Sequence, residues 1–126
     1  MTCVIAGIGC RRGSTASAIL SALDLACAQA GLRADALAAP AFKRNEAGLM
    51  DAARLRGVKL ILVEPAPLAS AQELCSTRSA RAERATGFAS ICEASALAAA
   101  GAAGRLLLAR VALGGVTCAL AEEGRA

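Results

Sequence analysis

Apolar residues along this chain occur both as short continuous runs and as stretches in which they recur every three or four positions. Three short runs predict buried strands, over residues 2–8, 36–41 and 58–64. Two intervening segments have helical spacing, over residues 15–30 and 46–55. Gly31 and Gly57 follow these segments and are placed to end helices, and Asn45 is placed to cap the second one. The alternation of strands and helices indicates an α/β fold.

The second half of the chain predicts helices followed by a hairpin. Pro65 and Pro67 are expected to stop the third strand. Two segments have the form of a capping box and predict helix starts, at Ser70–Glu73 and at Ser90–Glu93, the latter opening an Ala-rich helix to about Ala103. Two strands are expected after it, over residues 105–111 and 116–121. The Gly114-Gly115 pair between them is typical of a tight antiparallel turn.

These elements predict one three-layer α/β/α domain over residues 1–126. Its sheet is expected to be mixed and mostly parallel, with about five strands and a C-terminal antiparallel hairpin. Ligands of such sheets bind beyond the carboxyl ends of the parallel strands. The topology therefore brings three loops together, at Gly9–Ser14, Ala41–Glu46 and Glu64–Leu68.

The segment Gly7–Gly13, which runs from the end of the first strand toward the first helix, has the chemistry of an anion site. Three glycines allow a sharp turn, two arginines supply positive charge, and a helix N-terminus supplies free N–H groups. Lys43 and Arg44 lie in the second loop of the same edge. The ligand-binding candidates in the first loop are Gly9, Cys10, Arg11, Arg12, Gly13, Ser14 and Thr15.

The loop does not match the known nucleotide motifs. Its glycines are spaced one residue too far apart for GxGxxG, and no Gly-Lys-Ser/Thr follows. Adjacent guanidinium groups suit carboxylates, with which they pair bidentately. A small nucleotide- or phosphate-binding domain is the lower-ranked alternative. The structural alternative is that Arg11 and Arg12 are solvated loop charges and that the glycines only permit a turn.

The catalytic candidates are Lys43 and Glu46, which follow the second strand, and Glu93, which lies in the later capping box. Lys43 and Glu46 could form an ion pair or an acid–base pair. For Glu46, a favourable charge in the first helical turn is the preferred interpretation, and Glu93 already has a structural role in a capping box. Cys10 lies beside two arginines at a helix start, which would lower its pKa, although a small residue fitting a tight turn is the more probable explanation.

Composition narrows the chemistry further. The chain has no histidine, which removes the usual general base and zinc ligand, and its thiols are dispersed, so a protein-bound metal is not expected. No cofactor is predicted either. The net charge of +4 and two phenylalanines favour an acidic ligand over nucleic acid. The six cysteines form no CxxC pair, and no secretory signal or membrane span is seen, so the simplest expectation is a cytoplasmic protein with reduced thiols. Ala-rich faces leave a homodimer possible.

Taken together, the motifs resemble a family of cobalamin-biosynthesis proteins that comprises CobE and the C-terminal domain of CbiG. The resemblance rests on GIGCRRG followed by Ser14-Thr15, and it extends in order over nearly the whole chain. Its later parts are Lys43, Glu46, Gly48-Leu49, Ser79, Gly87, the EASAL of 93–97, and Val116-Thr117. The first helical turn lacks the acidic residues common in the family, and Arg110 stands where lysine is commoner. The length suits the stand-alone CobE type.

The resemblance implies a role in building the corrin ring. It adds Ser79 and Thr117 to the ligand-binding candidates. The first hypothesis is a carrier or accessory protein that binds a precorrin, a tetrapyrrole with acetate and propionate carboxylates, at the basic loop. The alternative is a hydrolase or lyase like CbiG, which opens a ring lactone and releases acetaldehyde. Whether the chain is an enzyme is left open, and other corrin-pathway enzymes are possible partners.

Overall fold

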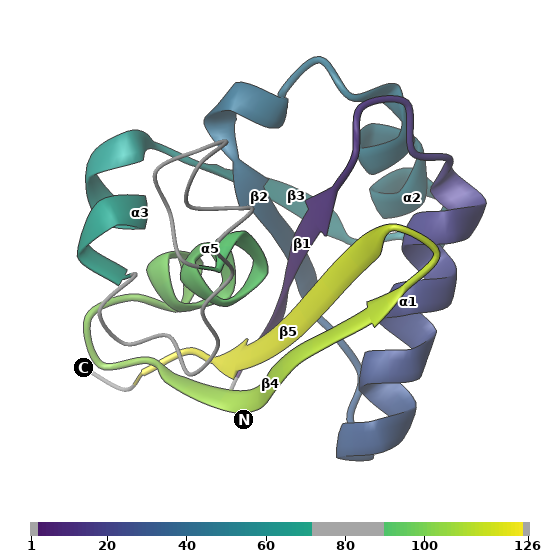
Figure 1. The fold of residues 1–126 in the computed structure, drawn as a ribbon. Helices are drawn as coiled ribbons and strands as arrows, with labels where there is room; N and C mark the ends of the chain where they lie inside the picture. Colours follow the sequence, from purple (N-terminus) through teal and green to yellow (C-terminus); the bar gives the residue numbers. More distant parts are fainter. Residues whose placement is uncertain (1–2, 72–89, 125–126) are drawn as a thin grey trace.

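A central five-stranded sheet organises residues 3–71 and 90–124, which are the residues described in this computed structural model (Figure 1). The strands lie in the order β3-β2-β1-β5-β4, with bounds β1 Val4–Cys10, β2 Ala36–Pro40, β3 Lys59–Val63, β4 Arg105–Leu113 and β5 Val116–Glu122. The first three are parallel to one another. β5 runs antiparallel to both β1 and β4. The predicted mixed sheet with a C-terminal hairpin is therefore confirmed.

Helices cover both faces of this sheet, as the three-layer prediction requires. Their bounds are α1 Ala16–Ala30, α2 Ala47–Arg56, α3 Pro65–Ala71 and α5 Ile91–Ala100, with a 3₁₀ turn η1 at Ala41–Lys43. The apolar residues of α1 and α2 pack into one core, and those of α3 and α5 pack into the other. Figure 1 shows the two pairs of helices on opposite sides of the strands.

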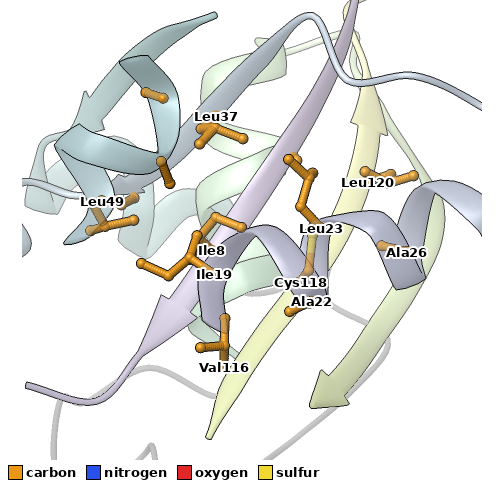
Figure 2. Packing of buried hydrophobic residues seen from close by; sticks show 14 of the residues in the cluster. Ile8, Ile19, Ala22, Leu23, Ala26, Leu37, Leu49, Val116, Cys118 and Leu120 are labelled. Atoms are coloured by element: carbon orange, nitrogen blue, oxygen red, sulfur yellow. The ribbon is translucent and has the colours of Figure 1, made fainter. Parts of the chain in front are cut away.

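The two cores differ in the size of their side chains. Figure 2 shows the core under α1, where Ile8, Ile19, Leu23 and Leu120 interdigitate with almost no exposure. The core under α5 is built largely from alanine. Small residues let that helix approach β1 closely: a Cβ added at Gly7 would lie 1.9 Å from the carbonyl oxygen of Cys92. The alanine-rich composition therefore brings α5 directly onto the central strand.

Local signals set the ends of several elements as predicted. The Thr15 hydroxyl accepts a hydrogen bond from the N–H of Ala18 at 3.1 Å and caps α1. Gly31 and Gly57 end α1 and α2 in the left-handed conformation. The Gly114-Gly115 pair joins β4 to β5 with φ angles of 61° and 80°, which is the geometry of a tight hairpin.

β3 ends at Val63 just before Pro65, as predicted, and Pro65 also opens α3, where its fixed φ and missing N–H suit the first helical position. Other local predictions are wrong. Ser70 lies inside α3, and most of the predicted third loop is helical. The rest of the predicted capping box, at residues 72–73, lies outside the described residues. The N-cap of α2 is Glu46 rather than Asn45. Ser90 is the N-cap of α5, but its side chain makes no capping hydrogen bond.

The first strand also extends further than predicted. β1 continues to Cys10, so Gly9 belongs, like Gly7, to the sheet and not to the turn. The missing side chain at each glycine makes room for a close neighbour. At Gly7 the neighbour is α5, and at Gly9 it is the Thr117 hydroxyl, which would lie 2.4 Å from an added Cβ. The turn itself is confined to Arg11–Ser14, hereafter the basic turn, where Gly13 has a φ of +79°.

Candidate functional site

The basic turn and the loop after β2 meet at the edge of the sheet where the parallel strands end, hereafter the carboxyl edge. The N–H of Gly13 donates a hydrogen bond to Oε2 of Glu46 at 2.9 Å. The start of α2 also packs against the turn, since a Cβ added at Gly48 would lie 2.1 Å from the carbonyl oxygen of Ser14. The predicted neighbourhood of the first two loops is thus confirmed.

The basic turn presents its two arginines outward. Both the N–H and the hydroxyl of Ser14 donate to the carbonyl oxygen of Arg11, at 3.1 and 2.8 Å, and close the turn. Arg11 and Arg12 are exposed. A Cβ added at Gly115 would lie 3.4 Å from Cδ and Nε of Arg11, so this side chain extends along the β4–β5 turn. The guanidinium groups therefore face solvent at the carboxyl edge.

Cys10 is close to two of the three charged residues in the second loop, Lys43 and Glu46. Burial raises the pKa of its thiol above the ordinary value, and Glu46 raises it further, while Lys43 lowers it. The raised pKa does not support the alternative of an activated thiol, because burial of the side chain outweighs the neighbouring positive charge. Lys43 and Glu46 are joined by a hydrogen bond from the N–H of Glu46 to the carbonyl oxygen of Lys43 at 3.0 Å, so both belong to the same part of the carboxyl edge.

Thr117 and Thr15 both use their hydroxyls within the protein. Thr117 Oγ1 donates to the carbonyl oxygen of Gly9 at 3.4 Å, from the neighbouring strand. Burial raises the pKa of the Cys92 thiol, and hydrogen bonds with Thr117 and Ser90 partly lower it. The Thr15 hydroxyl caps α1. Both threonines lie at the predicted edge, where they hold the backbone around the site.

Glu93 stands apart from Glu46. It lies on α5, on the opposite face of the sheet from α2, and it is completely buried. Its Oε2 accepts a hydrogen bond from the N–H of Arg110 at 2.8 Å. That N–H lies where the β4–β5 register shifts between Leu108 and Val111, which is the irregularity of a β-bulge. The structure thus does not bring the two candidate carboxylates onto one face. Ser79 lies outside the described residues.

Two apolar side chains on the same edge were not predicted. Phe42, in η1, is 52% exposed, and Leu113, at the end of β4, is 45% exposed. Leu113 pairs with Val116, which in turn pairs with Cys10 at the end of β1. The only sequence signal for them was their apolar character in segments otherwise rich in glycine and basic residues. With the arginines and Lys43 they make the carboxyl edge both cationic and apolar.

The described residues offer no evident metal site. Within 3–71 and 90–124, no three His, Cys, Asp or Glu side chains gather closely enough to hold an ion. The cysteines in these ranges are free thiols. In the same part of the chain, every helix is too short or too polar to cross a bilayer.

Fold and edge together define a small α/β domain with a cationic, partly apolar rim at its carboxyl edge. The chain matches the family model described as Cobalamin synthesis G C-terminus over residues 4–121, and it belongs to that family. The crystal structure of CobE, a protein from the cobalamin (vitamin B12) biosynthetic pathway, is similar over 96% of this chain and 90% of that one, with 36% identity and a TM-score of 0.89.

Two further solved structures share the fold. The cobalamin biosynthesis protein chiG from Agrobacterium tumefaciens is 38% identical, with 94% of this chain and 96% of that chain covered and a TM-score of 0.77. A putative cobalamin biosynthesis protein G homolog from Sulfolobus solfataricus is 21% identical, with a TM-score of 0.74 over 97% of this chain and 37% of that one. At that identity the last match supports the fold alone. No curated protein sequence matches the chain.

Proposed function

We propose that this chain acts in cobalamin biosynthesis by binding a corrin-ring intermediate at its carboxyl edge, as a carrier or accessory protein. The ligand class is a polycarboxylate macrocycle. Arg11, Arg12 and Lys43 would pair with carboxylates on its rim, and Phe42 and Leu113 would contact the apolar ring. Family membership supports the pathway, and the chemistry of the edge supports the ligand class.

One observation carries this proposal: the hydrogen bond from Gly13 to Glu46. It joins the basic turn to the start of α2 across 33 positions in sequence. Without that contact, the cations of the two loops would be separate surface charges, each worth little in water. Held together, they present several charges to one ligand, and guanidinium–carboxylate pairs gain strength and direction from bidentate geometry.

The arrangement also accounts for the kind of anion expected. A phosphate site would need several converging backbone N–H groups. Here the N–H of Gly13 is already bonded to a carboxylate, and that of Ala18 to the Thr15 hydroxyl. The charged donors at the edge are long side chains, which suit carboxylates spread around a ring.

The test compares two corrinoids with the same ring. Cobyrinic acid has free carboxylates, whereas in cobinamide they are amidated, and both can be titrated by visible absorbance. We expect the wild-type protein to bind the acid, and the double variant Arg11→Ala/Arg12→Ala to weaken binding by about tenfold to a hundredfold, the order lost with two charge-assisted contacts.

A double variant with the same charge loss serves as control. Arg33→Ala/Arg54→Ala removes two exposed arginines at the opposite edge, before β2 and in the last turn of α2. It should bind cobyrinic acid like the wild type. If both double variants bind cobyrinic acid equally weakly, the loss of affinity is due to net charge and not to the position of the arginines. If the wild type binds cobyrinic acid and cobinamide equally well, carboxylate recognition is rejected.

A further inference from the structure

Glu46 has a place in the site that differs from that of a general base. We propose that it is a positioning residue: its carboxylate holds the basic turn so that Arg11 and Arg12 face the ligand. The part concerning ligand binding rests on the proposed function, whereas the part concerning the turn does not.

The side chain of Glu46 does not serve its own helix. Glu46 is the N-cap of α2 with extended backbone angles, yet it makes no capping hydrogen bond. An N-cap side chain ordinarily accepts from the second or third N–H of its helix. Here the carboxylate instead accepts the N–H of Gly13, from a loop that is distant in sequence.

The backbone of Glu46 is rigidly held and so can act as an anchor. Its N–H donates to the carbonyl oxygen of Lys43 at 3.0 Å, and its own carbonyl oxygen accepts from Leu49 at 3.1 Å. Leu49 is completely buried in the core under α1. The tight contact between Gly48 and Ser14 fixes the separation of helix and turn. The carboxylate therefore extends from a fixed point.

The basic turn needs such an anchor. Its internal hydrogen bonds all end on the carbonyl oxygen of Arg11, and they leave the peptide between Arg12 and Gly13 without support from within the turn. Gly13 has a positive φ, and a glycine can leave that conformation at little steric cost. The bond to Glu46 is the contact that fixes this peptide, and with it the direction of the preceding arginine.

This assignment separates two roles that the same residue could play. A general base needs its charge and its proton affinity. A positioning residue needs an acceptor oxygen, which glutamine also supplies. Glu46→Gln keeps the acceptor and removes the charge, Glu46→Ala removes both, and Glu123→Gln removes one exposed negative charge from the opposite edge as a control.

The test uses two readouts on the whole protein. In the absence of ligand, amide hydrogen exchange at Gly13 is followed by NMR. We expect exchange to accelerate by about tenfold or more in Glu46→Ala, the order of one lost charge-assisted hydrogen bond. Exchange should be slower in Glu46→Gln than in Glu46→Ala, and it should be unchanged in Glu123→Gln.

The second readout is the affinity for cobyrinic acid. Glu46→Ala should bind at least about fivefold more weakly, while Glu46→Gln should bind as well as the wild type or better, because a charge that repels the ligand is gone. Unchanged Gly13 exchange in Glu46→Ala would overturn the proposal, as would equal loss of affinity in Gln and Ala variants. If exchange responds as expected but the wild type binds no corrinoid, the proposed function fails and the role in the turn stands.

Discussion

Replacing Gly48 by alanine tests whether α2 and the basic turn are in direct contact. The added Cβ would lie 2.1 Å from the carbonyl oxygen of Ser14 and 3.3 Å from the carbonyl carbon of Thr15. These are backbone atoms, so no side chain can rotate away to make room. Either the turn or the first turn of α2 must shift, and the bond between Gly13 and Glu46 lies within that region.

Two opposing effects set the size of the change. Alanine in a helix is favoured over glycine by about 1 kcal/mol. Overpacking against fixed atoms costs roughly 1–3 kcal/mol, and a contact this short belongs at the upper end. We therefore expect Gly48→Ala to lower the free energy of unfolding by about 1–2 kcal/mol, which for a chain of this size corresponds to a fall in Tm of roughly 3–10 °C.

The assay must avoid intrinsic fluorescence, because the chain has no tryptophan or tyrosine. Urea unfolding followed by far-UV circular dichroism gives the free energy directly. Ser21→Ala, at an exposed position of α1, provides a control in which helix propensity rises without a new contact. A Gly48→Ala protein as stable as the wild type, with Gly13 exchange unchanged, would refute the contact between helix and turn.

Two other predictions concern the core. Gly7→Ala should lower the free energy of unfolding by about 3 kcal/mol or more and loosen α5, because the new Cβ would lie 1.9 Å from the Cys92 carbonyl oxygen; urea unfolding of that variant checks it, and a loss under 1 kcal/mol would contradict it. Burial also raises the pKa of the Cys118 thiol above its ordinary value of 9.0. The folded protein therefore keeps this proton longer than the unfolded chain, and the stability so gained is complete below about pH 9 and is lost as the pH rises toward the folded pKa. The urea concentration at the unfolding midpoint should decrease as the pH is raised from about 8 to about 10.5, and it should decrease less in Cys118→Ala. An equal dependence of the midpoint on pH in the two proteins would contradict this.

Much of the fold followed from local patterns in the sequence. Thr15 and Gly31 delimit α1 through contacts within a few residues, and the Gly114-Gly115 pair sets its own turn. The alternation of strands and helices also fixed the three layers and the edge at which the loops meet. These features depend on short-range chemistry, for which sequence is a sufficient guide.

The misassigned features depend on partners distant in sequence. Pro65 follows the end of β3 as predicted, but the helix that it also opens is stabilised by the packing of α3 against α5. Glu46 and Glu93 both follow helix-start patterns, yet their carboxylates accept N–H groups at Gly13 and Arg110. Gly48 carried no local signal of its close contact with Ser14. Such pairings are set by tertiary structure, which overrides local propensity.

The central claim is that the ligand binds at the carboxyl edge. The most direct test is a titration of isotopically labelled protein with cobyrinic acid, followed by amide chemical shifts. We predict shifts concentrated at residues 10–15, 42–46 and 113–117, with little change at 32–35 and 100–104 on the opposite edge. Chemical-shift changes centred on the opposite edge, or no changes at a large excess of cobyrinic acid over protein, would contradict this claim.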